Sequence, residues 1–89
     1  MNPVDLKKEC FTVAMDIICW MRREQKENLK LKEFEHIISG RMCAKRIIKR
    51  RDDLPDKIMT WVIEELEGQA IINRECYPGG SDIISLQPC

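Results

Sequence analysis

The sequence predicts an α+β domain in which three to four helices are followed by a C-terminal β-hairpin. Two stretches, 3–24 and 54–67, carry apolar residues at the three- and four-residue spacing of amphipathic helices. Near the C-terminus, Pro78-Gly79-Gly80-Ser81 separates two runs rich in β-branched residues, which is typical of a hairpin turn. We expect strands over 70–77 and 82–87, so the fold is mainly helical and ends in a two-stranded antiparallel unit.

The 89 residues suffice for one domain with one modest core, which we expect to span 1–89. Hydrophobic residues at 44% and charged residues at 34% are typical of a globular chain, and the formal net charge is zero. Any electrostatic function must therefore depend on an uneven distribution of charge. The chain starts and stops close to predicted elements, which suggests a domain excised from a longer protein.

The cysteine pattern favours a reducing, intracellular compartment. The five cysteines are an odd number, form no CxxC pair, and in three cases lie in apolar helical patterns. His36 is the sole histidine, so no spacing typical of a zinc site occurs, and we expect neither a metal nor a cofactor. Charged residues interrupt Val4–Met21, so the sequence predicts no signal peptide. No run approaches the roughly 18 apolar residues of a membrane span.

The helix predicted over 3–24 begins with the capping sequence Asn2-Pro3-Val4-Asp5. A second apolar stripe lies beside its main one, so its polar arc is narrow. This helix is either central to the core or half covered by a partner. Trp20 and Trp61 lie within apolar stripes, which favours core packing over a role as interface anchors. The residues that we assign to a candidate protein interface are Val4, Phe11, Met15 and Cys19.

Between the two long helices, the sequence predicts a short strand and two short helices. Alternation of apolar and polar residues suits a strand over 29–31, and an apolar face suits a helix over 32–39 that Gly40 terminates. A further helix is predicted over 42–51, with apolar residues on one side and basic residues on the other. The basic residues of 41–51 are Arg41, Lys45, Arg46, Lys49, Arg50 and Arg51.

The helix predicted over 54–67 has Asp53 as its cap and Pro55 in its first turn, and Gly68 stops it. Apolar residues occupy most of its circumference. Its exposed arc holds one lysine against three acids, so this helix presents an acidic surface. The residues of the arc are Asp56, Lys57, Thr60, Glu64 and Glu67.

The order helix, short strand, helix, helix and hairpin resembles the winged-helix variant of the helix-turn-helix fold. The residues that carry the resemblance are Ile58–Asn73, IMTWVIEELEGQAIIN, in which an apolar-periodic run and a glycine precede two aliphatic residues that open the wing strand. A compact winged helix needs only a short turn between its second and third helices, whereas 41–53 adds a basic amphipathic piece here. This extended layout looks like the C-terminal winged helices of replication factors, such as replicative helicase and origin-recognition subunits. The pattern is shared by many families, so it implies a fold better than a function.

Catalysis is not indicated, because the sequence has no phosphate-binding loop, nucleophile elbow or paired catalytic side chains. We therefore interpret the chain as a non-enzyme. A winged helix that binds DNA usually lays its third helix in the major groove, but the acidic arc disfavours this mode here. The better nucleic-acid surface is 41–51, helped by Arg74 in the wing, unless that segment is simply a solvated helix face.

The resemblance implies a third possibility, because winged helices with acidic or apolar third helices often serve as docking modules. We expect a winged-helix interaction module of an intracellular, nuclear complex that acts on nucleic acid, with 41–51 as an accessory basic surface. The alternative is a domain that binds DNA or RNA directly through the basic segment and the wing. We expect a protein partner, leave a homo-oligomer open, and expect no membrane association.

Overall fold

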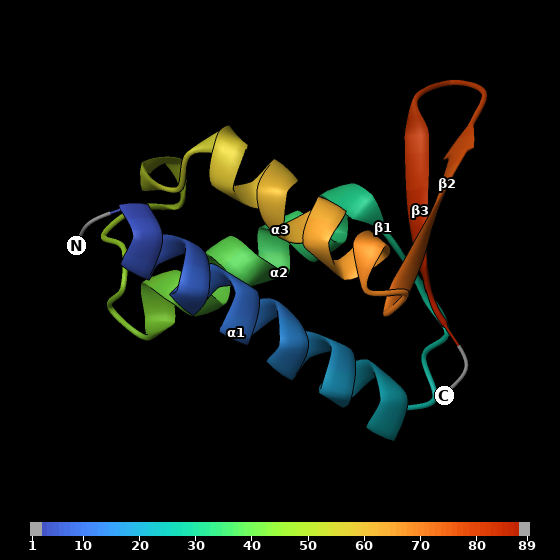
Figure 1. Ribbon diagram of the computed structural model, residues 1–89, viewed down its shortest axis with the longest axis horizontal. Helices are drawn as coiled ribbons and strands as arrows, with labels where there is room; N and C mark the ends of the chain where they lie inside the picture. Colours follow the sequence, from blue (N-terminus) through green and yellow to red (C-terminus); the bar gives the residue numbers. More distant parts are fainter. Residues whose placement is uncertain (1–2, 88–89) are drawn as a thin grey trace.

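The computed structural model describes residues 3–87, which contain three α-helices, one 3-10 turn and three β-strands (Figure 1). In chain order these elements are α1 (Pro3–Arg23), β1 (Asn28–Lys30), α2 (Leu31–Ala44), η1 (Arg51–Asp53), α3 (Asp56–Gly68), β2 (Ile72–Tyr77) and β3 (Ser81–Leu86). The predicted α+β class and the C-terminal hairpin are confirmed. The element order is compatible with a winged-helix layout.

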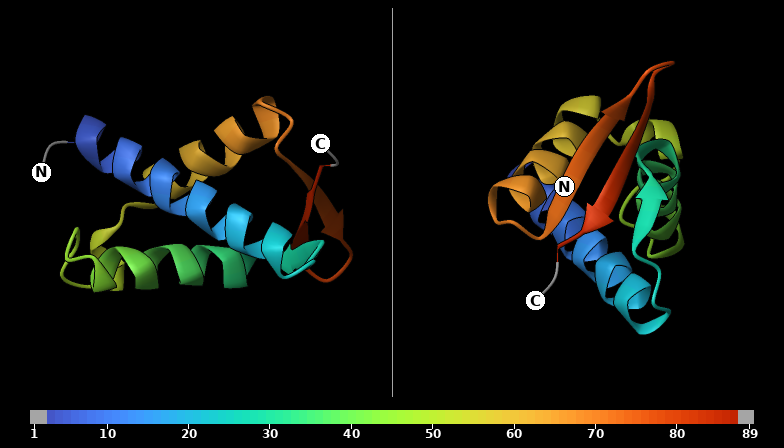
Figure 2. Two further views of the ribbon diagram at one scale, coloured as in Figure 1. Left: turned by 90° about the horizontal axis from the view of Figure 1, so that it is seen from below. Right: turned by 90° about the vertical axis from the view of Figure 1, so that its right-hand side faces the viewer.

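The helices pack against one another, and a small antiparallel sheet stands at the end of the molecule where α1 finishes (Figures 1 and 2). The strand order is β1-β3-β2, so the first strand of the chain pairs with the last. Leu29 of β1 lies opposite Ile84 of β3, which in turn lies opposite Arg74 of β2. Because α2 begins at Leu31, directly after β1, this pairing fastens the hairpin to the helical part.

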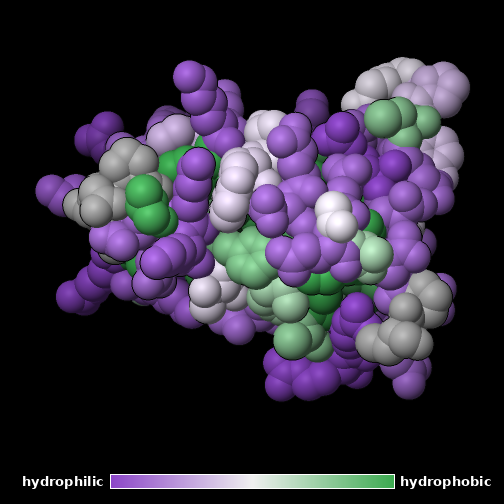
Figure 3. All heavy atoms as spheres, in the orientation of Figure 1, coloured by the Kyte–Doolittle hydropathy of each residue, from purple (hydrophilic) through white to green (hydrophobic). Residues whose placement is uncertain are grey.

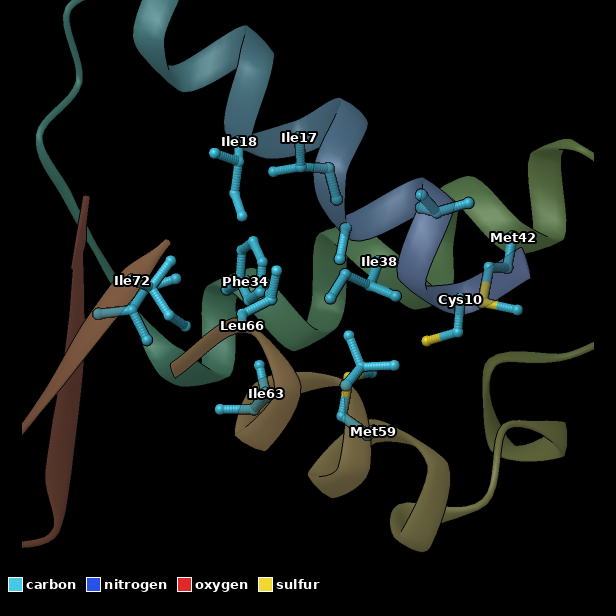
Figure 4. Packing of buried hydrophobic residues seen from close by; sticks show 14 of the residues in the cluster. Cys10, Ile17, Ile18, Phe34, Ile38, Met42, Met59, Ile63, Leu66 and Ile72 are labelled. Carbon is cyan, nitrogen blue, oxygen red and sulfur yellow. The ribbon is translucent and has the colours of Figure 1, made fainter. Parts of the chain in front are cut away.

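Phe34 of α2 lies at the centre of the core, where the three helices meet the sheet. Figure 4 shows its ring between Ile18 of α1, Leu66 of α3 and Ile72 of β2. All four side chains are at most 2% exposed. Truncating a buried phenylalanine to alanine costs about 3–5 kcal/mol, which is a large part of the roughly 5–15 kcal/mol that stabilises a domain. Phe34 therefore joins every layer of the fold.

One continuous helix, α2, replaces the predicted helix over 32–39 and the first turn of the one predicted over 42–51, so the expected stop at Gly40 is wrong. Phe34, Ile38 and Met42 recur every four residues across Gly40, and each is completely buried. Burying this stripe outweighs the roughly 1 kcal/mol that a glycine costs inside a helix. Gly40 also makes room for Arg51, whose Nη2 lies 3.0 Å from the position that a Cβ on Gly40 would occupy.

The rest of the predicted basic helix is absent, because α2 ends at Ala44 and residues 45–50 form turns and bends. The Oδ2 atom of Asp53 accepts a hydrogen bond from the backbone N–H of Arg50 at 3.0 Å and so caps η1. Asp53 is therefore not the cap of α3. That helix begins two residues later than predicted, with Pro55 at its N-cap and no side-chain cap.

Each of α1, α2 and α3 is followed by a residue other than glycine in the left-handed region. These residues are Gln25, Arg46 and Ala70, with φ of 57°, 61° and 57°. After α3, the N–H of Ala70 donates to the carbonyl of Glu67 at 3.0 Å and that of Ile71 donates to Leu66 at 2.9 Å. This is a Schellman ending, and glycine usually occupies its left-handed position. Gly68, predicted as the stop, is instead the last helical residue.

Candidate functional site

The candidate protein interface on α1 lies partly open to solvent. Val4 is 60% exposed, Cys19 is exposed, and Phe11 and Met15 are half-buried against the core. Residues 11, 15 and 19 recur every four positions, so they form one stripe along the helix. The structure thus brings Phe11, Met15 and Cys19 together, and Val4 lies about two turns before Phe11 on the same side of α1.

The stripe continues across a helix–helix junction to Trp61 of α3. The Phe11 and Trp61 ring centroids lie 6.4 Å apart with a tilt of 59°, and Lys7 Nζ lies 5.1 Å from the Trp61 centroid. Trp61 is half-buried, so it is neither a fully buried core residue nor a free anchor. We call Phe11, Met15, Cys19 and Trp61 the α1–α3 seam. In Figure 3, hydrophobic side chains form a patch over this part of the face.

Trp61 was not assigned to the interface from the sequence, because helical spacing gives no information about which helices cross. Trp20, the other tryptophan, is also half-buried and lies 5.9 Å from Lys26 Nζ. The prediction that Trp20 and Trp61 pack in the core is therefore correct in part, because both pack against it but stay half-buried.

The basic residues of 41–51 gather at the end of the molecule opposite the hairpin (Figure 1). They do not share one helical face, because the chain leaves the helix after Ala44. Arg41 is half-buried and the other five are exposed. Lys45 Nζ lies 3.5 Å from Asp16 Oδ2, and Arg51 lies against α2 at Gly40. The segment is thus a basic loop with two of its side chains engaged by neighbouring helices.

Arg74 is separated from this basic loop. It lies on β2 at the other end of the molecule, where its Nε is 3.6 Å from Glu67 Oε1 of α3. The structure therefore does not bring Arg74 together with the basic residues of 41–51. The acidic arc of α3 is present: Asp56 and Glu64 are exposed, and Glu67 faces Arg74 of the hairpin.

A hollow of about 320 Å³ lies between α2, η1 and the start of α3, and no sequence pattern indicates it. Its lining mixes acids, bases and apolar residues, among them Glu35, His36, Asp56 and Met59. Burial raises the pKa of the Glu35 carboxyl above its ordinary value, and the nearby Asp56 carboxylate adds to the shift, while Lys32 and Arg74 oppose it. His36 is exposed, as expected. The lining also includes Ser39, whose hydroxyl donates a hydrogen bond to the backbone carbonyl of His36 at 3.0 Å.

Within residues 3–87, no three His, Cys, Asp or Glu side chains are grouped so that they would hold a metal ion. Over the same part of the chain, no helix is long and apolar enough to cross a membrane. No protein-family model, curated protein or solved structure matches the chain.

Proposed function

We propose that this domain is a non-catalytic docking module that binds a protein partner at the α1–α3 seam. The observation that carries the proposal is the Phe11–Trp61 contact, which extends the partly exposed α1 stripe onto a second helix. Half-buried aromatic and methionine side chains are typical of interface centres, because they offer large contact areas that repack readily. Their exposure in the isolated chain leaves apolar area that a partner would cover.

The winged-helix-like layout supports placing this module in an intracellular, nuclear complex that acts on nucleic acid. In that setting the acidic arc of α3 argues against the usual major-groove docking, since acids held near phosphates oppose the counterion release that drives binding. Protein docking by the seam and electrostatic contact by the basic loop are then separate tasks on different faces.

The proposal is tested by affinity capture with matched variants of one helix. Met15→Asp places a charge in the seam, whereas Thr12→Asp places the same charge on the exposed polar arc of α1. We expect Met15→Asp to lose the captured partner and Thr12→Asp to retain it. Cys19→Asp is a second seam variant whose exposed position protects the fold. Circular dichroism of each variant shows whether the fold survives, and retention of the partner by folded Met15→Asp and Cys19→Asp contradicts the proposal.

A second candidate function, direct DNA or RNA binding, is favoured by the concentration of six basic residues in 41–51. The sharpest test reverses Lys49 and Arg50 to glutamate, because both are exposed and only the backbone of Arg50 is hydrogen-bonded to Asp53. If the loop contacts phosphates, affinity falls steeply with salt, and each lost contact lowers the log–log slope by about 0.9 on duplex DNA. Absence of binding at low salt, or an unchanged slope in the variant, removes this candidate.

A further inference from the structure

The charges of α1 are segregated around the seam. On the helical wheel, Lys7 and Lys8 lie beside Phe11 and Met15, whereas the acids of α1 lie on the exposed arc beyond Cys19. Those acids are Asp5, Glu9 and Asp16. On α3, Lys57 precedes Trp61 by one turn and therefore lies on the same side of that helix. The half of the seam nearest the start of α1 is thus bordered by three lysines.

Two features of the seam favour a helix as its occupant. The backbone groups of α1 and α3 are already hydrogen-bonded within their helices, so an extended segment would find no backbone partners there, whereas a helix satisfies its own. Cys19 lies eight positions after Phe11, or about 12 Å along the axis, which matches about two turns of a packed helix. A helix of a partner that packs on the seam beside α1 and α3 would therefore bury the whole stripe.

A second copy of this chain is disfavoured by charge. Basic residues stand near both ends of the stripe, with Lys8 at one end and Arg22 at the other. Parallel pairing of two α1 helices would bring Lys8 against Lys8, and antiparallel pairing would bring Lys8 against Arg22 of the other copy. Like charges at such positions destabilise helix pairing.

We propose that the α1–α3 seam binds an amphipathic helix whose apolar stripe is flanked by acidic residues. The acids of this helix face Lys7, Lys8 and Lys57, and its apolar side chains cover Phe11, Met15 and Trp61. This inference rests on the proposed docking function and adds the chemical class of the partner. Glu64 and Glu65 border the far half of the seam on α3, so the acidic flank is required only where the lysines lie.

The test uses two synthetic helical peptides of roughly 18 residues, long enough to form helix when bound. Both carry the same leucine stripe at helical spacing, and their flanks are glutamate in one and lysine in the other. The indole N–H resonance of Trp61 in the labelled domain reports binding at the seam, and that of Trp20 serves as an internal control. We expect the glutamate peptide to shift Trp61 and to bind roughly tenfold more tightly than the lysine peptide, with the preference shrinking in high salt.

Charge-reversal variants make the assignment specific. Lys8→Glu combined with Lys57→Glu removes two exposed lysines at the seam, and Lys30→Glu combined with Lys49→Glu makes the same change in net charge elsewhere. We expect only the first pair to abolish the preference for the glutamate peptide. Equal binding of both peptides at Trp61 overturns the acidic partner class and leaves docking at the seam intact. No Trp61 shift with either peptide overturns both the partner class and docking of a helix at this seam.

Discussion

Replacing Ala70 with glycine should stabilise the domain. Its φ of 57° lies in the left-handed region, and its N–H closes the end of α3 by donating to Glu67. An L-residue in this region costs roughly 1–2 kcal/mol, because its Cβ crowds the backbone. Glycine avoids that crowding but loses roughly 0.5–1 kcal/mol more chain entropy on folding. The side chain of Ala70 is exposed, so its removal sacrifices little packing.

The difference between the midpoints of these two ranges predicts that Ala70→Gly raises the free energy of unfolding by about 0.75 kcal/mol. For a domain of this size, that corresponds to a rise in Tm of roughly 3–6 °C. The matched control is Ala44→Gly, the same substitution at the exposed last residue of α2. Ala44 has a helical backbone conformation, so glycine relieves no crowding there and should lower the free energy of unfolding by roughly 0.5–1 kcal/mol.

Thermal and urea unfolding followed by circular dichroism measures both variants. Opposite signs for Ala70→Gly and Ala44→Gly are the expected result. If Ala70→Gly destabilises the domain as Ala44→Gly does, the left-handed helix ending carries no strain, and the assignment of a Schellman motif to that position is refuted.

Three further predictions concern titratable groups. The pKa of Glu35 is raised in the folded state, mainly by burial, so the folded state binds this proton more tightly than the unfolded state does. The stability that this proton contributes is therefore fully present below the unfolded-state pKa, and it is lost as the pH rises through the folded-state pKa. Glu35→Gln should therefore be more stable than the wild type at pH 7 but not at pH 3, and denaturation showing equal differences at both pH values contradicts this. Tyr77, the sole tyrosine, donates a hydrogen bond to Glu75, which raises the pKa of the phenol, so absorbance titration should show its pKa falling towards the ordinary value in Glu75→Gln. Burial raises the pKa of the Cys10 thiol to about 11, so alkylation at pH 8 should modify exposed Cys19 readily and Cys10 only after unfolding; comparable rates in the folded domain are the contrary result.

Elements with strong local signals were predictable from the sequence. The hairpin depends on Pro78-Gly79-Gly80 between β-branched runs, and both glycines adopt positive φ as such a turn requires. The long apolar stripes of α1 and α3 placed those helices within about two residues of their bounds. Periodicity over several turns outweighs any single residue.

The region between α2 and α3 could not be predicted, because tertiary contacts decide it. Gly40 is a common helix stop, yet the buried stripe through Met42 carries the helix past it. Arg46 has no sequence signal for a left-handed conformation, and without that turn the basic residues would have formed one helical face. Asp53 lies close in sequence to the starts of both η1 and α3, and its carboxylate caps η1 rather than α3.

The residues of the candidate site also fall into those that spacing along one helix predicts and those that only the fold brings together. Phe11, Met15 and Cys19 follow from four-residue spacing on one helix, whereas Trp61 joins them only because α1 and α3 cross there. The separation of Arg74 from the basic loop likewise depends on where the hairpin stands relative to the end of α2. Spacing along one element gives a stripe, but only the fold gives a surface.

Thiol reactivity tests the central claim, docking at the α1–α3 seam, most directly. Cys19 lies in the seam and Cys76 lies on β2 of the hairpin, and both are exposed. Pulse alkylation of the tagged domain, in buffer and in cell extract, followed by mass spectrometry, compares the two sites in one molecule. Docking at the seam predicts that the extract slows alkylation of Cys19 and leaves Cys76 unchanged. Capture of a partner with Cys19 as reactive as in buffer contradicts it.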